Sequence, residues 1–161
     1  MIFLLDNKLI KTKSELTRVC RNLNHNITLV NGTFDYLHPG HYYLLYKARM
    51  LGFPLLVLLN SDSSVKRLKG KDRPIFKLSD RVFCLLSLSY VDYVYVFKED
   101  RITSYFEIIR PKLWVKGSDY KDSIDPDERM EAIRFHVKIH FVKRTAYSSS
   151  KILKKLIKSE N

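Results

Sequence analysis

Short apolar segments with the periodicity of strands alternate with segments that have the periodicity of helices, and this alternation limits the chain to few folds. Residues 54–60 are almost wholly apolar, as expected of a strand buried on both faces of a parallel sheet. The pattern predicts strands at 26–31, 54–60, 93–97, 112–116 and 137–142. It predicts helices at 11–23, with Ser14 as the N-cap, and at 39–51, 78–88, 102–110, 126–135 and 148–158. We therefore expect a three-layer α/β domain with a mostly parallel sheet.

The length and composition are those of one folded domain. The 161 residues, 45% hydrophobic and 29% charged, suffice for one core, and no linker or repeat divides them, so we expect a single domain over residues 1–161. No apolar run approaches the ~20 residues of a membrane-spanning helix, so no transmembrane segment is expected. Cys20 and Cys84 lack the spacing of a disulfide framework or a four-cysteine zinc site, which indicates a reduced, cytoplasmic protein.

The formal net charge of +12 indicates a polyanionic partner, which could be nucleic acid, a membrane surface or phosphorylated small molecules. The last expected helix carries its lysines on one face, and a solvated surface explains them better than a membrane-surface role. His136 and His140 stand four residues apart, but the alternation of their neighbours indicates a strand. We therefore expect no zinc site.

The loop after the strand at 26–31 holds residues suited to phosphate binding. Ligands of parallel sheets bind at the carboxyl ends of the strands, where this loop is expected. His38 and His41 flank Gly40 at the start of the next helix, where free N–H groups and the helix dipole favour an anion. Two imidazoles there can donate hydrogen bonds to a phosphoryl group, whereas paired histidines elsewhere are more often core or solvated side chains. The strand before and the helix after favour the phosphate site.

Six positions of this loop match the pattern G-x-F-D-x-x-H-x-G-H: Gly32, Phe34, Asp35, His38, Gly40 and His41. The segment resembles the nucleotidyltransferase superfamily with the H-x-G-H signature, which includes cytidylyltransferases and small adenylyltransferases. Residues 60–70, 73–74, 80–81 and 115–120 extend the resemblance to the adenylyltransferase domain that makes ADP-activated heptose from heptose 1-phosphate. The resemblance implies a Rossmann-like nucleotidyltransferase fold, a role in carbohydrate metabolism and ATP as the nucleotide.

A basic segment supplies further candidates for phosphate contacts. Lys66, Lys69 and Arg81 are cations suited to a triphosphate or a sugar phosphate, although a solvated basic face is the alternative. In the resembling family the lysines of this loop and the arginine matching Arg81 contact phosphates. Lys69 and Arg81 are the stronger candidates, because loop spacing does not fix which lysine reaches inward. For Lys71 and Arg73, a phosphate contact and a solvated basic face both stay open.

The resemblance also implies nucleotide-binding roles for a larger set of residues. They are Gly32, Thr33, Phe34, Asp35, Gly40, Lys66, Lys116, Gly117, Asp119, Arg144, Ser148 and Ser149. Asp35 is more readily a structural ligand of its loop than a general base, and Asp119 either contacts a substrate or stabilises a turn. Ser148 and Ser149 open the last expected helix, where one would cap the helix and both could bind a triphosphate. Arg144 and Thr145 resemble glycerol-phosphate and phosphoethanolamine cytidylyltransferases, which leaves CTP open.

The resemblance implies an enzyme that transfers AMP from ATP to a sugar phosphate, with heptose 1-phosphate as the expected acceptor, and releases pyrophosphate. His38, His41, Lys69 and Arg81 are the expected catalytic residues. The triphosphate implies Mg²⁺, for which the sequence shows no carboxylate cluster. Expected partners are a nucleoside triphosphate and a phosphorylated sugar or polyol, and the resemblance is compatible with a homodimer.

Two alternatives stay open. One is a cytidylyltransferase that uses CTP and glycerol 3-phosphate or a similar alcohol phosphate. The other is a basic nucleic-acid-binding module without catalysis, which the intact His38 and His41 disfavour and which no RNP-like aromatic pair supports.

Overall fold

The structure is a computed structural model that describes residues 7–143. Its centre is a six-stranded sheet in the order β1-β4-β3-β2-β5-β6, with every neighbouring pair parallel. The strands are β1 (Leu9–Ile10), β2 (Thr28–Gly32), β3 (Leu55–Asn60), β4 (Tyr93–Phe97), β5 (Leu113–Gly117) and β6 (Lys138–Val142). The expected α/β fold with a parallel sheet is confirmed.

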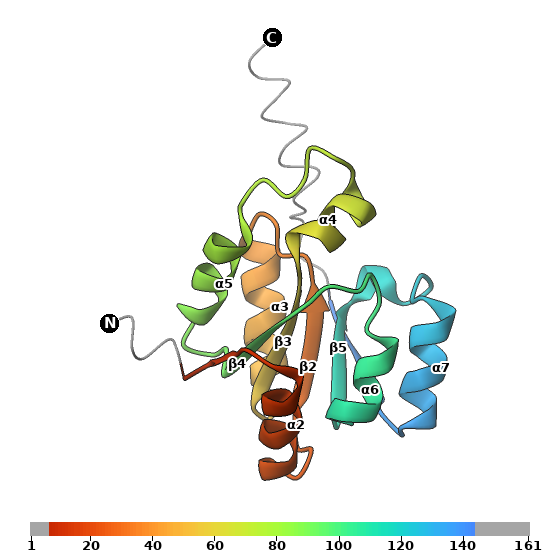
Figure 1. Ribbon diagram of the computed structural model, residues 1–161. Coiled ribbons are helices and arrows are strands. Elements are labelled where there is room, and N and C mark those ends of the chain that lie inside the picture. The colour runs from red at the N-terminus through yellow and green to blue at the C-terminus, as the bar shows by residue number, and fades with distance from the viewer. Residues whose placement is uncertain (1–6, 144–161) are drawn as a thin grey trace.

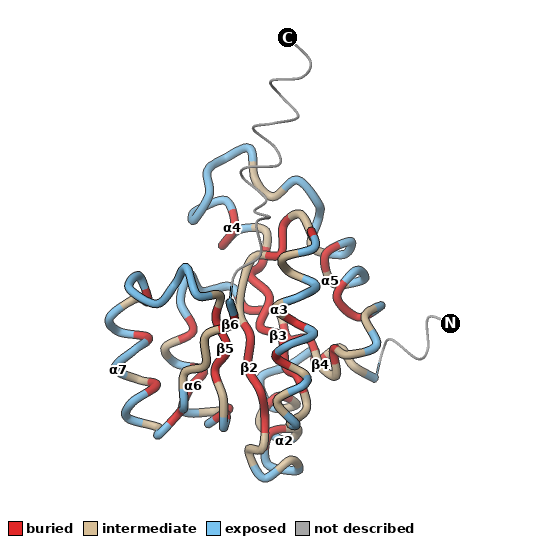
Figure 2. The backbone as a smooth tube through the Cα atoms, turned by 180° about the vertical axis from the view of Figure 1, so that it is seen from behind, coloured by how far each residue is buried: buried red, intermediate tan, exposed pale blue. Residues whose placement is uncertain are grey.

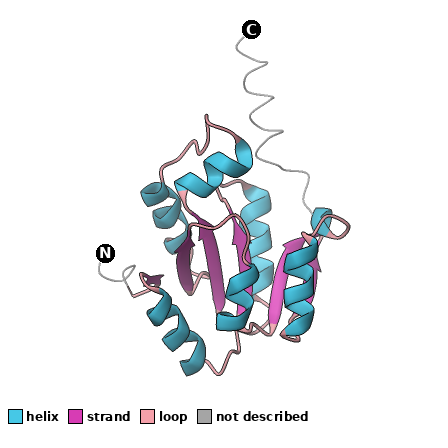
Figure 3. Ribbon diagram, turned by 45° about the vertical axis from the view of Figure 1, so that its right-hand side comes forward, coloured by secondary structure: helices cyan, strands magenta, loops and turns pink. Residues whose placement is uncertain are grey.

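Helices cover both faces of the sheet (Figures 1 and 3). They are α2 (Lys13–Asn22), α3 (Pro39–Arg49), α4 (Asp62–Lys69), α5 (Leu78–Leu86), α6 (Thr103–Ile109) and α7 (Pro126–Arg134). One core cluster joins the sheet to α2, α6 and α7, and a second joins it to α3 and α5. The strands are therefore mostly buried between two helical layers, while the outer helix surfaces are exposed (Figure 2). Within residues 7–143, no helix combines the length and hydrophobicity that a membrane-spanning segment needs.

The sequence pattern was wrong or silent at three places. The N-cap of α2 is Thr12 rather than Ser14, because the Thr12 hydroxyl accepts a hydrogen bond from the Glu15 N–H. The two-residue strand β1 is too short to leave a periodic signal. The basic segment expected as a loop forms α4, which Ser61 caps and which Val65 anchors in the core. The expected helix at 148–158 lies outside the described residues.

Arg81 of α5 joins several loops at the carboxyl edge of the sheet. Its side chain is fully buried, and its Nη1 atom donates to the carbonyl oxygens of Thr33 at 2.6 Å and Asn60 at 2.9 Å. Its Nη2 atom donates to Asp62 Oδ1 at 2.7 Å, and its Nε atom donates to the Phe76 carbonyl at 3.2 Å. One guanidinium thus holds the loop after β2, the end of β3, the start of α4 and the loop before α5.

Replacing Arg81 with alanine should destabilise the fold by about 3 kcal/mol or more, because it leaves buried carbonyl groups without donors. The matched control is Arg67→Ala. Arg67 also binds an aspartate, Asp100, at 2.7 Å, but both side chains are well exposed, so its loss should cost less than about 1 kcal/mol. Denaturant unfolding of both variants measures the difference, and equal losses would show that Arg81 does not hold the loops together.

Candidate active site

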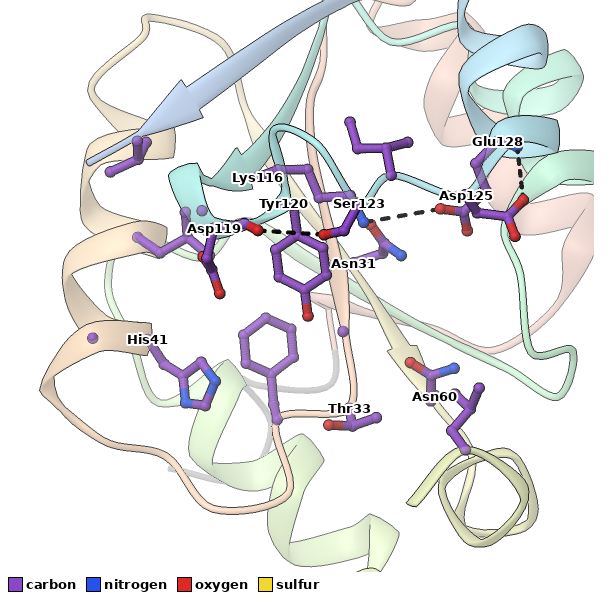
Figure 4. A pocket seen from close by; sticks show the side chains of 18 of the residues that line it. Asn31, Thr33, His41, Asn60, Lys116, Asp119, Tyr120, Ser123, Asp125 and Glu128 are labelled. Carbon is purple, nitrogen blue, oxygen red and sulfur yellow. Dashed lines mark hydrogen bonds and ion pairs between the residues drawn. The ribbon is translucent and has the colours of Figure 1, made fainter. Parts of the chain in front are cut away.

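The principal pocket among the described residues opens at the carboxyl edge of the sheet, where the strand order reverses between β2 and β5. Its volume is about 680 Å³. The loops after β2 and β5, the end of β3, the tip of α4 and the starts of α3 and α7 line it (Figure 4). A parallel sheet brings the ends of distant strands to one edge, so this pocket collects residues that are far apart in sequence.

His38 and His41 lie together at the start of α3, as expected. Their ring centroids are 3.9 Å apart, and the rings are stacked with an interplanar angle of 29°. His38 is the N-cap, and its Nδ1 atom accepts a hydrogen bond from the Gly40 N–H at 3.1 Å. Because Nδ1 is an acceptor there, a neutral His38 carries its proton on Nε2. Both residues line the pocket, and Nε2 of His38 is the nitrogen that can donate.

His41 is held in its neutral form. Burial lowers its pKa from the usual value to about 3, and the nearby positive charges of His38 and Lys69 act in the same direction. A main-chain interaction with Tyr36 opposes the shift without reversing it. The ring also packs edge-on against Phe34, with centroids 5.2 Å apart. Its Nδ1 atom is buried and has no hydrogen-bond partner within residues 7–143.

The two candidate lysines of α4 occupy different places. Lys69 lines the pocket at the end of the helix, although much of its side chain is exposed. Burial of its ammonium group lowers its pKa, and Asp35 opposes that effect while Arg73 and Arg81 add to it. Lys66 is exposed and is not among the residues that line the pocket. The structure therefore brings Lys69, and not Lys66, to the paired histidines.

Lys116, Gly117 and Asp119 line the opposite wall, at the end of β5. Lys116 is buried, with Nζ 4.0 Å from Glu128 Oε2 and 4.5 Å from the centroid of the Trp114 ring. Burial lowers the pKa of Lys116, and the Glu128 carboxylate opposes this shift. Any side chain at Gly117 would put its Cβ 2.5 Å from Asp119 Oδ1, so glycine lets that carboxylate approach the main chain.

Four of the expected loop residues line the pocket, and one does not. Gly32, Thr33, Phe34 and Gly40 all form its wall. The Asp35 carboxylate is fully buried outside the pocket, where it pairs with Arg73 Nη1 at 2.6 Å and accepts the Ile75 N–H. The interpretation of Asp35 as a structural ligand agrees with this position, and its expected place among nucleotide contacts does not.

The structure places Arg81 away from the pocket lining, with its donors directed to main-chain carbonyls and Asp62. A phosphate contact by Arg81 would require those bonds to break, so its place in the fold is that of a positioning residue. Arg144, Ser148 and Ser149 lie outside the described residues.

Sequence reasoning missed several residues that line the pocket. Asn31 is the next-to-last residue of β2, Asn60 ends β3, Arg101 follows β4, and Glu128 lies in the first turn of α7. The available signal was positional, because polar residues at the last positions of otherwise apolar strands face the carboxyl edge. Glu128 had no such signal, since its pairing with Lys116 depends on tertiary packing.

Within residues 7–143, no group of three or more histidine, cysteine or acidic side chains could hold a metal ion. Single carboxylates in the pocket fit a Mg²⁺ ion that arrives bound to triphosphate oxygens, because Mg²⁺ commonly takes only one or two carboxylates from the protein. Asp119, which lines the pocket at the end of β5, is a carboxylate that would make such a contact.

Comparison with known proteins gives relatives of one kind. The cytidylyltransferase-like family model matches residues 29–159. The bifunctional protein HldE of Campylobacter jejuni subsp. jejuni serotype O:2 is 40% identical over 153 residues, which are 92% of this chain and 32% of that protein. The protein of the same name from Helicobacter pylori strain HPAG1 is 41% identical over 150 residues, 91% of this chain and 31% of that protein. The chain thus spans about a third of the length of these relatives.

Solved structures share the fold. A lipopolysaccharide core biosynthesis protein from Thermoplasma volcanium superposes with a TM-score of 0.60 and 26% identity, covering 76% of this chain and 98% of that one. Pantothenate synthetase from Thermus thermophilus gives a TM-score of 0.64 at 15% identity, covering 87% of this chain and 63% of that one, which shows the fold alone. The family match over residues 29–159 includes the stacked histidines and the β5 wall, and the chain belongs to the cytidylyltransferase-like family of nucleotidyltransferase domains.

Proposed function

We propose that the chain transfers AMP from ATP to a sugar phosphate, heptose 1-phosphate, and releases pyrophosphate. The observation that carries the proposal is the stacked pair His38 and His41, which lines the pocket at the start of α3 with Lys69 nearby. The bifunctional HldE relatives and the lipopolysaccharide core biosynthesis protein support a sugar nucleotide as the product. So does the resemblance of residues 60–81 and 115–120 to ADP-heptose adenylyltransferases.

In the proposed reaction, a phosphate oxygen of the acceptor attacks the α-phosphorus of ATP. The bond between that phosphorus and the oxygen bridging to the β-phosphorus breaks, and this oxygen leaves with pyrophosphate. The acceptor phosphate is already ionised, so no general base is required. Catalysis then consists of positioning two anions and stabilising the charge that develops between them.

The residues of the pocket divide these tasks. His38 and His41 hold the α-phosphate at the helix N-terminus and donate to its oxygens as charge shifts. Lys69 draws the two anions together, and the β5 wall around Lys116 holds the nucleoside. Arg81 positions the loops that carry these groups. We assign the β,γ end of the triphosphate to Ser148 and Ser149, and Mg²⁺ would neutralise the charge of the triphosphate that carries it.

The choice of nucleotide tests the substrate assignment. With heptose 1-phosphate as acceptor, kcat/KM for ATP should exceed that for CTP at least about tenfold, or ~1.4 kcal/mol of differential transition-state binding. Pyrophosphate release with each nucleotide measures this ratio. A preference for CTP, or activity with glycerol 3-phosphate alone, would replace the heptose assignment with a cytidylyltransferase. Salt-sensitive oligonucleotide binding without any turnover would indicate a nucleic-acid-binding module.

His38→Asn should lower kcat about 100-fold with little change in the thermal midpoint. Asparagine keeps the N-cap, so the fold is preserved while the donating Nε2 is lost. His140→Asn is the matched control, because His140 lies on β6 outside the pocket lining, and its kcat should stay at the wild-type value. Steady-state kinetics and melting curves of both variants give the comparison. Near-normal turnover of folded His38→Asn would remove His38 from the catalytic group.

The lowered pKa of His41 predicts a pH dependence of stability. As the pH falls from 6.5 toward 3, the unfolded chain takes up a proton at this imidazole that the folded chain does not, so stability decreases. Between pH 7 and pH 5 the loss from this group should be about 1–2 kcal/mol. His41→Gln should lose correspondingly less over that interval in denaturant unfolding. An equal loss in wild type and variant would show that His41 titrates normally.

A further inference from the structure

The sheet face under α2, α6 and α7 is apolar along most of its length and becomes polar at its carboxyl end. Along β2 the residue pointing to this face changes from Leu29 to Asn31, and along β3 it changes from Leu58 to Asn60. Asn31 pairs in register with Leu58, so Asn31 and Asn60 project to the same side of the sheet. Both line the pocket (Figure 4). Each of these two adjacent strands therefore contributes one carboxamide side chain to the lining of the pocket.

The Asn31 amide has a fixed orientation. Trp114 Nε1, which can only donate, lies 3.0 Å from Asn31 Oδ1, so the amide oxygen faces the indole. The Asn31 NH₂ group then faces away from Trp114, and within residues 7–143 no hydrogen bond uses its two protons. Asn31 thus presents donors to the pocket.

The Asn60 amide is fixed in the opposite sense. Its Nδ2 atom donates to Ser64 Oγ at 2.9 Å. The single hydroxyl proton of Ser64 is directed to the Glu99 carbonyl at 2.9 Å and Asp100 Oδ1 at 3.1 Å, both of which only accept. Ser64 must therefore accept from Asn60, and the Asn60 Oδ1 atom is left as an acceptor without a partner in the described part of the chain.

We propose that Asn31 and Asn60 form the subsite that selects the hydroxyl groups of the sugar acceptor. A hydroxyl accepts from one group and donates to another, which matches the donor of Asn31 and the acceptor of Asn60. This inference rests on the proposed function. It deepens that function by assigning acceptor specificity to a pair of neutral amides.

The acceptor fits this place better than the nucleotide does. The nucleoside is assigned to the β5 wall, beyond β2 from Asn60. Asn60 directly precedes α4, whose far end carries Lys69, so a ligand at Asn60 can direct its phosphate toward that lysine. A sugar at Asn60 and a nucleoside at the β5 wall would lie on either side of β2, and the loop after β2 leads to the paired histidines.

Asn31→Asp tests the proposal by replacing the hydrogen-bond donor that Asn31 presents to the pocket with an acceptor. One carboxylate oxygen keeps the bond from Trp114, while the other places an acceptor where the wild type presents donors. The KM for the acceptor should rise at least about tenfold, with the KM for ATP within about twofold of wild type. Asn26→Asp is the control, because Asn26 precedes β2 at the far end of the strand and lies outside the pocket lining. It should leave both values unchanged.

A series of monodeoxy sugar 1-phosphates, used with wild type and with Asn31→Asp, gives a second readout. For one member the wild-type kcat/KM should fall at least about tenfold, and Asn31→Asp should lower it little further, because the group that this amide binds is already absent. An increase in the KM for ATP alone, or equal use of every deoxy acceptor by wild type, would overturn the proposal.

Failure of the proposed function is seen separately, in the wild type alone. If wild type uses glycerol 3-phosphate and not heptose 1-phosphate, the proposed substrate is wrong. The KM for glycerol 3-phosphate of wild type and of Asn31→Asp then tests whether Asn31 and Asn60 form the acceptor subsite. If no acceptor turns over, titration of heptose 1-phosphate into wild type and Asn31→Asp decides it by affinity. A loss of at least about tenfold in the variant supports the subsite, and equal affinity contradicts it.

Discussion

The fold and the site depend on the parallel pairing of six strands, of which the central ones are buried on both faces. A sheet of this kind requires helical crossovers, and the crossovers return every strand in the same direction. All strand ends therefore meet at one edge, and the order β1-β4-β3-β2-β5-β6 leaves a crevice where the chain changes sides between β2 and β5. The buried Arg81 then holds the diverging loops together through main-chain carbonyls.

The electrostatics of this pocket suit a reaction between two anions. Burial lowers the pKa of His41 most, and the nearby positive charges of His38, whose ring is 3.9 Å away, and of Lys69 lower it further, so His41 stays neutral. A neutral imidazole at His41 still donates one hydrogen bond, while the positive field comes from Lys69, Lys116 and the helix N-terminus. Phosphate oxygens in the pocket would accept hydrogen bonds at short range and be attracted by the positive charges at longer range. This arrangement fits catalysis by positioning and charge stabilisation.

Much of this could be predicted from the sequence because its signals are local. The apolar strands, the helix start at Pro39 and the histidines around Gly40 each follow from nearest neighbours, and the structure confirms their places. The parts that were not predicted depend on contacts between distant residues. Arg81 looked like a phosphate ligand because sequence cannot show that Thr33 and Asn60 carbonyls surround it. Likewise, nothing local showed that Asn31 would face Trp114 or that Glu128 would meet Lys116.

The central claim is that an acceptor phosphate oxygen attacks the α-phosphorus of ATP in this pocket. Heptose 1-phosphate labelled with oxygen-18 in its nonbridging phosphate oxygens tests it directly when the products are followed by phosphorus NMR. The account predicts that the label enters the oxygen that bridges the two phosphorus atoms of the sugar nucleotide, and that none appears in pyrophosphate. Oxygen-18 in pyrophosphate, or release of free AMP with the labelled acceptor unchanged, would contradict it.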